Sequence, residues 1–217
     1  MNLYPKTRKY NQLIEMYSLM ANNGYKRNDG IFIPKENVYS DLEPIKFKNL
    51  LKEIFFENKI TEILDYGSGG GDWNKKINNS ETFKSFLGLK KINKFEPALG
   101  LNNIKKSQCV LCFDVLEHIF ISDIPHVLYE IFKYAKKLVV INVACYKAAA
   151  LLPNNENAHV TVRPPLWWKG CVDTVASNFP KIKYSFIAST EYQKAFIYPS
   201  TSHEKQINNN KFSALDL

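Results

Sequence analysis

Apolar residues recur along this chain with two different periods. In residues 10–25 and 44–59 they lie three or four positions apart, which is the spacing of an amphipathic helix. Residues 122–137 have the same pattern, and Pro125 suits the first turn of a helix there. Residues 166–179 are a further helix candidate. The pattern therefore predicts a chain with several amphipathic helices.

Short apolar runs that end at glycine, proline or polar residues predict strands. They alternate with the helices, which favours an α/β fold with a mostly parallel sheet and helices on both faces. The last two runs meet near Ser189 and Thr190 and predict an antiparallel closing hairpin. The predicted strands are residues 61–67, 91–97, 109–115, 138–144, 181–189 and 191–199.

These elements divide the chain into three predicted parts. Residues 1–58 form a helical N-terminal extension, residues 59–199 form the α/β domain, and residues 200–217 form a polar tail. A polar helix is expected from about Asp72. Residues 144–165 form an irregular segment that is too long for a simple connection, and such a length is typical of a functional loop.

The composition is that of a folded domain, since 45% of the 217 residues are hydrophobic. No run is long and apolar enough to span a bilayer, and the N-terminus lacks the apolar segment of a signal peptide. We therefore expect a cytoplasmic protein with no membrane partner. Cys109 and Cys112 lie in a predicted strand, where positions three apart face opposite sides, so we expect buried thiols rather than a metal site.

The net charge of +8 would suit an acidic partner such as nucleic acid. The lysines are scattered along the chain in pairs, however, and the sequence is rich in Asn, Ile and Lys, as an AT-rich genome would produce. We therefore expect a small-molecule partner and keep nucleic acid as the alternative.

A glycine-rich loop, GSGGG, follows the predicted strand at 61–67 directly. Glycines at this place allow a tight turn with positive φ and let a ligand approach the bare backbone. In open α/β sheets, ligands bind beyond the carboxyl ends of the strands. The dinucleotide pattern G-x-G-x-x-G is not met, because Asp72 and Asn74 stand where its last glycine belongs.

The spacing that is present, D-x-G-x-G-x-G from Asp65 to Gly71, resembles the first motif of class I S-adenosylmethionine-dependent methyltransferases. The segment CFDVLEHI resembles the fourth-strand segment of the same enzymes. Residues 151–168, LLPNNENAHVTVRPPLWW, resemble a group of small bacterial and phage-type methyltransferases. The resemblance covers roughly residues 10–195. It implies a Rossmann-like class I sheet over residues 59–199 and S-adenosylmethionine as the cofactor.

The resemblance also implies which residues bind that cofactor. Asp65 would hold the methionine amino group, and Glu96 at the end of the next strand would accept the two ribose hydroxyls. The implied cofactor-binding residues are Asp65, Gly67, Ser68, Gly69, Gly71, Glu96, Pro97, Asp114, Val115, Leu116 and His118.

One segment departs from the class I pattern. Only twelve residues lie between Glu96 and Cys109, where a full class I core has two helices and a third strand. The third strand is therefore expected to be shortened or missing. Adenine recognition is expected to fall to backbone amides or to Asn102 and Asn103.

Methyl transfer from a sulfonium mainly requires alignment of donor and acceptor, with a base only where the acceptor must lose a proton. His159 is predicted to be this catalytic base, with a loop-ordering hydrogen bond as the alternative role. Arg163 suits a carboxylate or phosphate of the acceptor. The expected substrate-binding residues are Tyr146, Asn157, Arg163, Trp167 and Trp168. No metal is expected, because the sequence shows no carboxylate and histidine cluster with ligand spacing near this loop.

The expected function is methyl transfer from S-adenosylmethionine to an O or N atom of a small-molecule or glycan-type acceptor. The alternatives are another S-adenosylmethionine-using enzyme, such as a lyase, a decarboxylase or an aminopropyltransferase, and a non-catalytic cofactor-binding partner subunit. A nicotinamide oxidoreductase would share the expected fold, but Asp72 stands where its dinucleotide-binding motif requires a glycine. Pro164 and Pro165 follow a different strand from the N-P-P-Y motif of DNA amino-methyltransferases, which argues against methylation of DNA bases.

Overall fold

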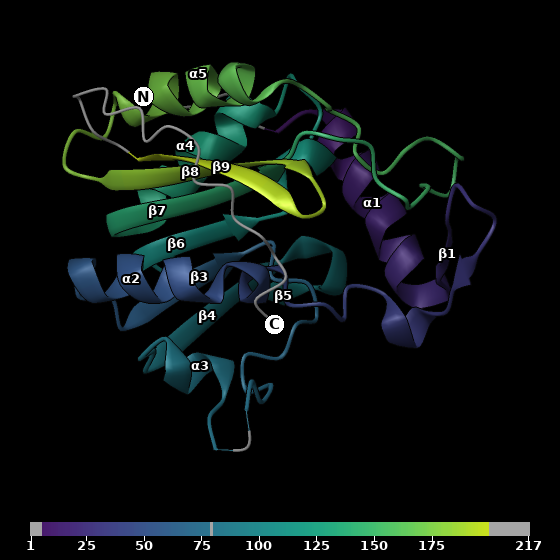
Figure 1. Ribbon diagram of the computed structural model, residues 1–217. Helices are drawn as coiled ribbons and strands as arrows, with labels where there is room; N and C mark the ends of the chain where they lie inside the picture. The colour runs from purple at the N-terminus through teal and green to yellow at the C-terminus, as the bar shows by residue number, and fades with distance from the viewer. Residues whose placement is uncertain (1–5, 79, 200–217) are drawn as a thin grey trace.

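A mixed sheet of seven strands forms the centre of the protein (Figure 1). The computed structural model describes residues 6–78 and 80–199, so the predicted tail at 200–217 lies outside the described residues. The strand order is β5-β4-β3-β6-β7-β8-β9. The bounds are β3 (Glu62–Tyr66), β4 (Lys91–Glu96), β5 (Leu101–Asn102), β6 (Ser107–Phe113), β7 (Ala135–Ala144), β8 (Lys183–Glu191) and β9 (Lys194–Pro199).

The directions of the strands confirm the α/β fold and the mostly parallel sheet. The inner strands β4, β3, β6, β7 and β8 run parallel to one another. The edge strands β5 and β9 run antiparallel to their neighbours, and β8 and β9 form the predicted closing hairpin. Only two residues form β5, which pairs antiparallel with the end of β4.

Alternating side chains of the strands build a core on each face of the sheet. On β6, Cys109 and Leu111 join the core on one face, whereas Val110 and Cys112 join the core on the other. Helix α2 (Lys48–Asn58) packs on the first face, and α4 (Ile124–Tyr134) and α5 (Pro165–Ala176) pack on the second. The two cysteines therefore face opposite sides, as predicted, and both are free thiols.

The N-terminal extension covers the sheet at the end where β3 and β6 finish (Figure 1). It contains α1 (Arg8–Asn23), the short antiparallel pair β1 (Tyr25–Lys26) and β2 (Phe32–Ile33), and the 3-10 turns η1 (Lys35–Asn37) and η2 (Glu43–Phe47). Thr7 caps α1 and also donates through its backbone and hydroxyl to the Asp123 carboxylate at the start of α4. The buried side chains Leu13, Tyr17 and Met20 of α1 share a core with Ala98 and Ala158.

The prediction of a polar helix from about Asp72 is wrong. After the glycine loop the chain forms turns, and among the residues described there the only helix is the single turn α3 (Phe83–Phe86). The Asp72 side chain accepts from the Asn74 backbone, and the Asn78 side chain accepts from the Ser80 backbone. Asp and Asn side chains that bond the backbone in this way compete with helix formation.

Within residues 6–78 and 80–199, none of the helices is both long enough and apolar enough to cross a membrane.

Candidate functional site

A cavity of about 530 Å³ lies at the carboxyl ends of β3, β4 and β6. The chain runs from β3 outward to β4 and β5, and then returns to β6 on the opposite side of β3. The carboxyl end of β3 is therefore a topological switch point, which is where open α/β sheets bind ligands. The extension forms the facing wall of the cavity.

The glycine loop between β3 and the following turns lines this cavity with Gly67, Ser68 and Gly69. Gly67 has φ of 77°, and a Cβ atom built on it would lie 2.2 Å from Val115 Cγ2. Glycine is required there because Val115, after β6, approaches the backbone so closely. Gly71 does not line the cavity, since its backbone packs against Asp41 and Leu42 of the extension.

Asp65, the fourth residue of β3, presents a buried carboxylate beside the glycine loop. The residue is 3% exposed, and its Oδ2 accepts a 2.8 Å hydrogen bond from Trp73 Nε1. Its Oδ1 accepts no hydrogen bond from the described residues, although the residue lines the cavity. Burial raises the pKa of Asp65 to about 6, in spite of the bond from Trp73 and the charge of Lys94. A cationic group in the cavity would stabilise the ionised form.

Glu96 ends β4, the strand next to Asp65, two positions after the residue that pairs with Asp65, and it also lines the cavity. Its Oε2 accepts from the Gly69 backbone at 3.1 Å, and its Oε1 accepts from the Ala98 backbone at 3.0 Å. Burial raises the pKa of Glu96, and these two backbone bonds oppose the rise. Each oxygen can accept a further hydrogen bond, so Glu96 both orders the loop and remains able to bind hydroxyl groups.

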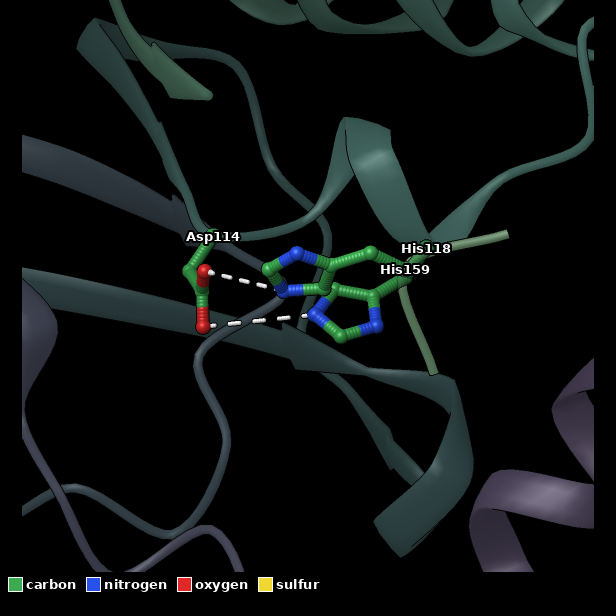
Figure 2. A group of neighbouring side chains, drawn as sticks. All are labelled: Asp114, His118 and His159. Atoms are coloured by element: carbon green, nitrogen blue, oxygen red, sulfur yellow. Dashed lines mark ion pairs between the residues drawn. The ribbon is translucent and has the colours of Figure 1, made fainter. Parts of the chain in front are cut away.

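Three polar side chains meet on another wall of the cavity (Figure 2). Asp114 follows β6, His118 ends the 3-10 turn η4 (Leu116–His118), and His159 comes from the long loop after β7. His118 Nε2 lies 4.0 Å from Asp114 Oδ2, and His159 Nε2 lies 3.9 Å from Asp114 Oδ1. Sequence spacing did not reveal this cluster, because 41 positions separate the two histidines in the chain.

Both histidines are held through Nδ1 by neighbouring oxygen atoms. His159 Nδ1 lies 2.5 Å from the Tyr146 carbonyl, which can only accept, so Nδ1 carries the proton. His118 Nδ1 lies 3.0 Å from the Ala158 carbonyl and 2.9 Å from the Tyr17 hydroxyl, which itself donates to that carbonyl. The Nε2 atoms of both rings face Asp114.

His159 is buried and neutral at physiological pH. Burial lowers the pKa of His159 to about 4, the charge of His118 adds to this decrease, and Asp114 and the Tyr146 carbonyl oppose it. A neutral imidazole with a free Nε2 can accept a proton or bind a metal ion. The loop-ordering bond to Tyr146 and the free Nε2 coexist, so the two roles considered for His159 do not exclude each other.

Two residues of the DVLEHI segment lie behind the cavity instead of on it. Leu116 is completely buried in the core and does not line the cavity. Glu117 is also completely buried, and its Oε1 accepts from the Ala144 backbone. Burial, followed by the charge of Asp114, raises the pKa of Glu117 well above its ordinary value.

Of the residues expected to bind the substrate, only Tyr146 lines the cavity. Asn157 instead holds the loop, since its side chain bonds both backbone groups of Ala148 and accepts from the His159 backbone. Arg163 is exposed and donates to the Val162 carbonyl. Trp167 and Trp168 belong to the α5 side of the core. Asn102 and Asn103 do not line the cavity either.

The extension contributes cavity residues that the sequence analysis did not assign to the site. Tyr10 and Tyr17 on α1, Tyr39, and Lys46 on η2 all line the cavity. Tyr10 and Tyr17 on the apolar face of the first predicted helix could have indicated this wall of the cavity. A buried tyrosine carries a hydroxyl that needs a hydrogen-bond partner. Tyr17 meets that need at the Ala158 carbonyl.

Comparison of the chain with protein-family models, with curated protein sequences and with solved structures found no match. The function therefore has to be inferred from the geometry of the cavity and from the sequence resemblance.

Proposed function

We propose that the protein is an S-adenosylmethionine-dependent methyltransferase of class I that acts on a small-molecule or glycan-type acceptor. The observation that carries the proposal is the pair of carboxylates, Asp65 and Glu96, on neighbouring strands of the switch-point cavity. The glycine loop with Gly67 and Gly69 joins them along the cavity wall. A ligand that has a cationic end and a ribose matches this arrangement.

The chemistry of the cavity wall fits the proposed cofactor. Asp65 is suited to an ammonium group, because its buried carboxylate with a raised pKa gains from a cationic partner. Glu96 is suited to a pair of ribose hydroxyls, because both of its oxygens retain acceptor capacity. When bound, S-adenosylmethionine supplies a methyl group on a sulfonium.

The acceptor side of the proposed enzyme is the wall formed by Asp114, His118 and His159 together with Tyr146 and Lys46. The free Nε2 of His159 can take the proton of an acceptor hydroxyl or amine, with its ring held in place through the Tyr146 carbonyl. The extension forms the opposite wall of the cavity and so reduces the access of water to it.

The first prediction concerns ligand choice. Calorimetric titration at pH 7.5 is expected to show one site for S-adenosylmethionine and S-adenosylhomocysteine and no binding of NAD. The reason is that the buried carboxylate of Asp65 borders the glycine loop at the switch point, where the pyrophosphate of a dinucleotide would be repelled. NAD binding without binding of either sulfur ligand would refute the proposed function.

The second prediction concerns Glu96. Glu96→Ala is expected to weaken S-adenosylhomocysteine binding by about 1.5–3 kcal/mol, because charge-assisted hydrogen bonds to two hydroxyls are lost. It is also expected to lower the free energy of unfolding by about 1 kcal/mol, since Glu96 caps the turn η3 (Pro97–Leu99). Calorimetry and thermal unfolding measure the two effects.

Glu53→Ala is the matched control, because Glu53 is exposed on α2 and does not line the cavity. It is expected to change neither quantity. If Glu96→Ala loses stability but binds S-adenosylhomocysteine as tightly as the parent, Glu96 only orders the loop and is not the ribose ligand.

A further inference from the structure

The cluster of Asp114, His118 and His159 has the composition of a metal site. One ligand atom from each side chain lies within 4.8 Å of the others. Figure 2 shows both imidazole rings turned toward the same carboxylate. Two imidazoles and one carboxylate are a recurring ligand set for zinc and for non-haem iron.

The surroundings of the two rings match those of metal-binding histidines. Such histidines usually donate their other ring N–H to a carbonyl or carboxylate, which fixes the tautomer and the orientation of the ring. Here the Tyr146 carbonyl accepts from His159, and the Ala158 carbonyl accepts from His118. Asn157 accepts from the His159 backbone and so holds the loop that carries one ligand and both carbonyls.

The Asp114 carboxylate faces both imidazole rings across gaps that an ion could bridge. Its Oδ2 lies 4.0 Å from His118 Nε2, and its Oδ1 lies 3.9 Å from His159 Nε2. The Asp114 backbone has φ of 57°, a conformation that costs free energy in a residue other than glycine. Three potential ligand atoms thus face one another at a strained position on a cavity wall, and a cation among them would be bound by all three.

We propose that Asp114, His118 and His159 bind one divalent transition-metal ion, with its open coordination positions facing the cavity. Nitrogen ligands favour zinc, iron, cobalt or manganese over magnesium, which prefers oxygen ligands throughout. Two bonds of about 2.1 Å at a tetrahedral angle place their ligand atoms about 3.4 Å apart. The ligand atoms here lie up to 4.8 Å apart, so the three side chains have to move together by roughly 1 Å on binding.

Metal binding at this cluster does not depend on the proposed methyltransferase function. In that enzyme, however, the ion would bind the oxygen of an acceptor hydroxyl, which then loses its proton to water more readily. This step rests on the proposed function. It would use the Nε2 lone pair of His159 for the metal bond, so His159 serves as a base only in the metal-free protein.

The test is titration of the full-length, metal-free protein with Zn²⁺ and, separately, with Co²⁺. Calorimetry is expected to show one tight Zn²⁺ site, and Co²⁺ is expected to give visible d–d absorption bands that Zn²⁺ abolishes. Millimolar Mg²⁺ is expected to compete with neither ion. Absence of a stoichiometric site, or Co²⁺ bands typical of thiolate ligands, would overturn the proposal.

Three variants assign the ligands. Asp114→Asn, His118→Ala and His159→Asn are each expected to weaken Zn²⁺ binding by at least about 10-fold. Asparagine tolerates the left-handed backbone at position 114 and can donate to the Tyr146 carbonyl from position 159, so both substitutions should fold. Thermal unfolding checks this.

His126→Ala is the matched control, since His126 lies on α4 and does not line the cavity. Equal Zn²⁺ affinity in the parent, the control and all three variants would show that the ion binds elsewhere and would overturn the proposal. Titration with S-adenosylhomocysteine in EDTA separates the two proposals, because cofactor binding does not need the ion.

Discussion

Substitution of His159 is expected to lower the rate of methyl transfer by about 10²–10⁴-fold while the affinity for S-adenosylhomocysteine stays within a few-fold of the parent. His159 offers the free Nε2 on the acceptor side of the cavity, whether that atom accepts a proton or binds an ion. Asp65 and Glu96, the proposed cofactor ligands, come from other strands. The loss should therefore appear in turnover.

Two substitutions separate chemistry from loop order. His159→Ala removes both nitrogens, whereas His159→Asn keeps a donor that can reach the Tyr146 carbonyl and lacks Nε2. Equal losses in both variants would show that Nε2 is the functional atom. A normal rate in His159→Asn would show that His159 only orders the loop.

The assay is formation of S-adenosylhomocysteine from S-adenosylmethionine in fractionated metabolite extracts, with His126→Ala as the control. A base with a pKa of about 4 stays neutral above pH 5, so the rate should not fall between pH 8 and pH 6 through protonation of His159. Loss of activity in EDTA and its return with Zn²⁺ or Mn²⁺ would assign the role to an ion. Full activity in EDTA would assign it to the imidazole.

Asp65→Asn is expected to have two opposite effects. It should weaken S-adenosylhomocysteine binding by about 2–5 kcal/mol, because a buried ammonium group would lose its anionic partner. It should also stabilise the ligand-free protein at pH 7–8 by up to about 3 kcal/mol, since burial holds the pKa of Asp65 at about 6. Asparagine can still accept the hydrogen bond from Trp73.

The sign of the stability effect follows from the proton affinity of Asp65. The folded protein binds this proton more tightly than the unfolded chain does, so ionisation lowers the stability of the parent as the pH rises from about 4 to about 6. The difference between Asp65→Asn and the parent should therefore vanish below about pH 4. Thermal unfolding from pH 3.5 to pH 8 measures it. A variant that is less stable than the parent at pH 7.5, yet binds normally, would contradict both effects.

Much of the fold could be predicted because its elements carry strong periodic signals. Leu13, Tyr17 and Met20 mark one face of α1, and the alternation of Cys109 to Phe113 marks a strand buried on both faces. The segment after the glycine loop could not be predicted from periodicity. There Asp72 and Asn78 bond the backbone locally, and this competition leaves no periodic trace in the sequence.

One side of the candidate site could be predicted, because its residues are close in sequence or end consecutive strands. Asp65 and Gly67 adjoin in sequence, and Glu96 ends the strand that pairs with β3. The other side depends on distant segments. The fold of a long loop brings His159 close to Asp114, and Tyr17 of the extension donates to the Ala158 carbonyl. Sequence spacing alone could not predict either contact. Trp167 and Trp168 were misassigned because a buried tryptophan and a binding tryptophan look alike in sequence.

The hydrogen bond from Trp73 to Asp65 gives the protein a built-in optical reporter. The indole is 3% exposed and stacks on Phe83, while its N–H ends on the carboxylate that borders the cavity. Any ligand that changes the charge of that carboxylate changes the electric field along the indole, and with it the wavelength of the emitted light. Trp168 sits fully buried on α5 and does not border the cavity. Occupancy can thus be followed by intrinsic fluorescence before any methyl acceptor is known.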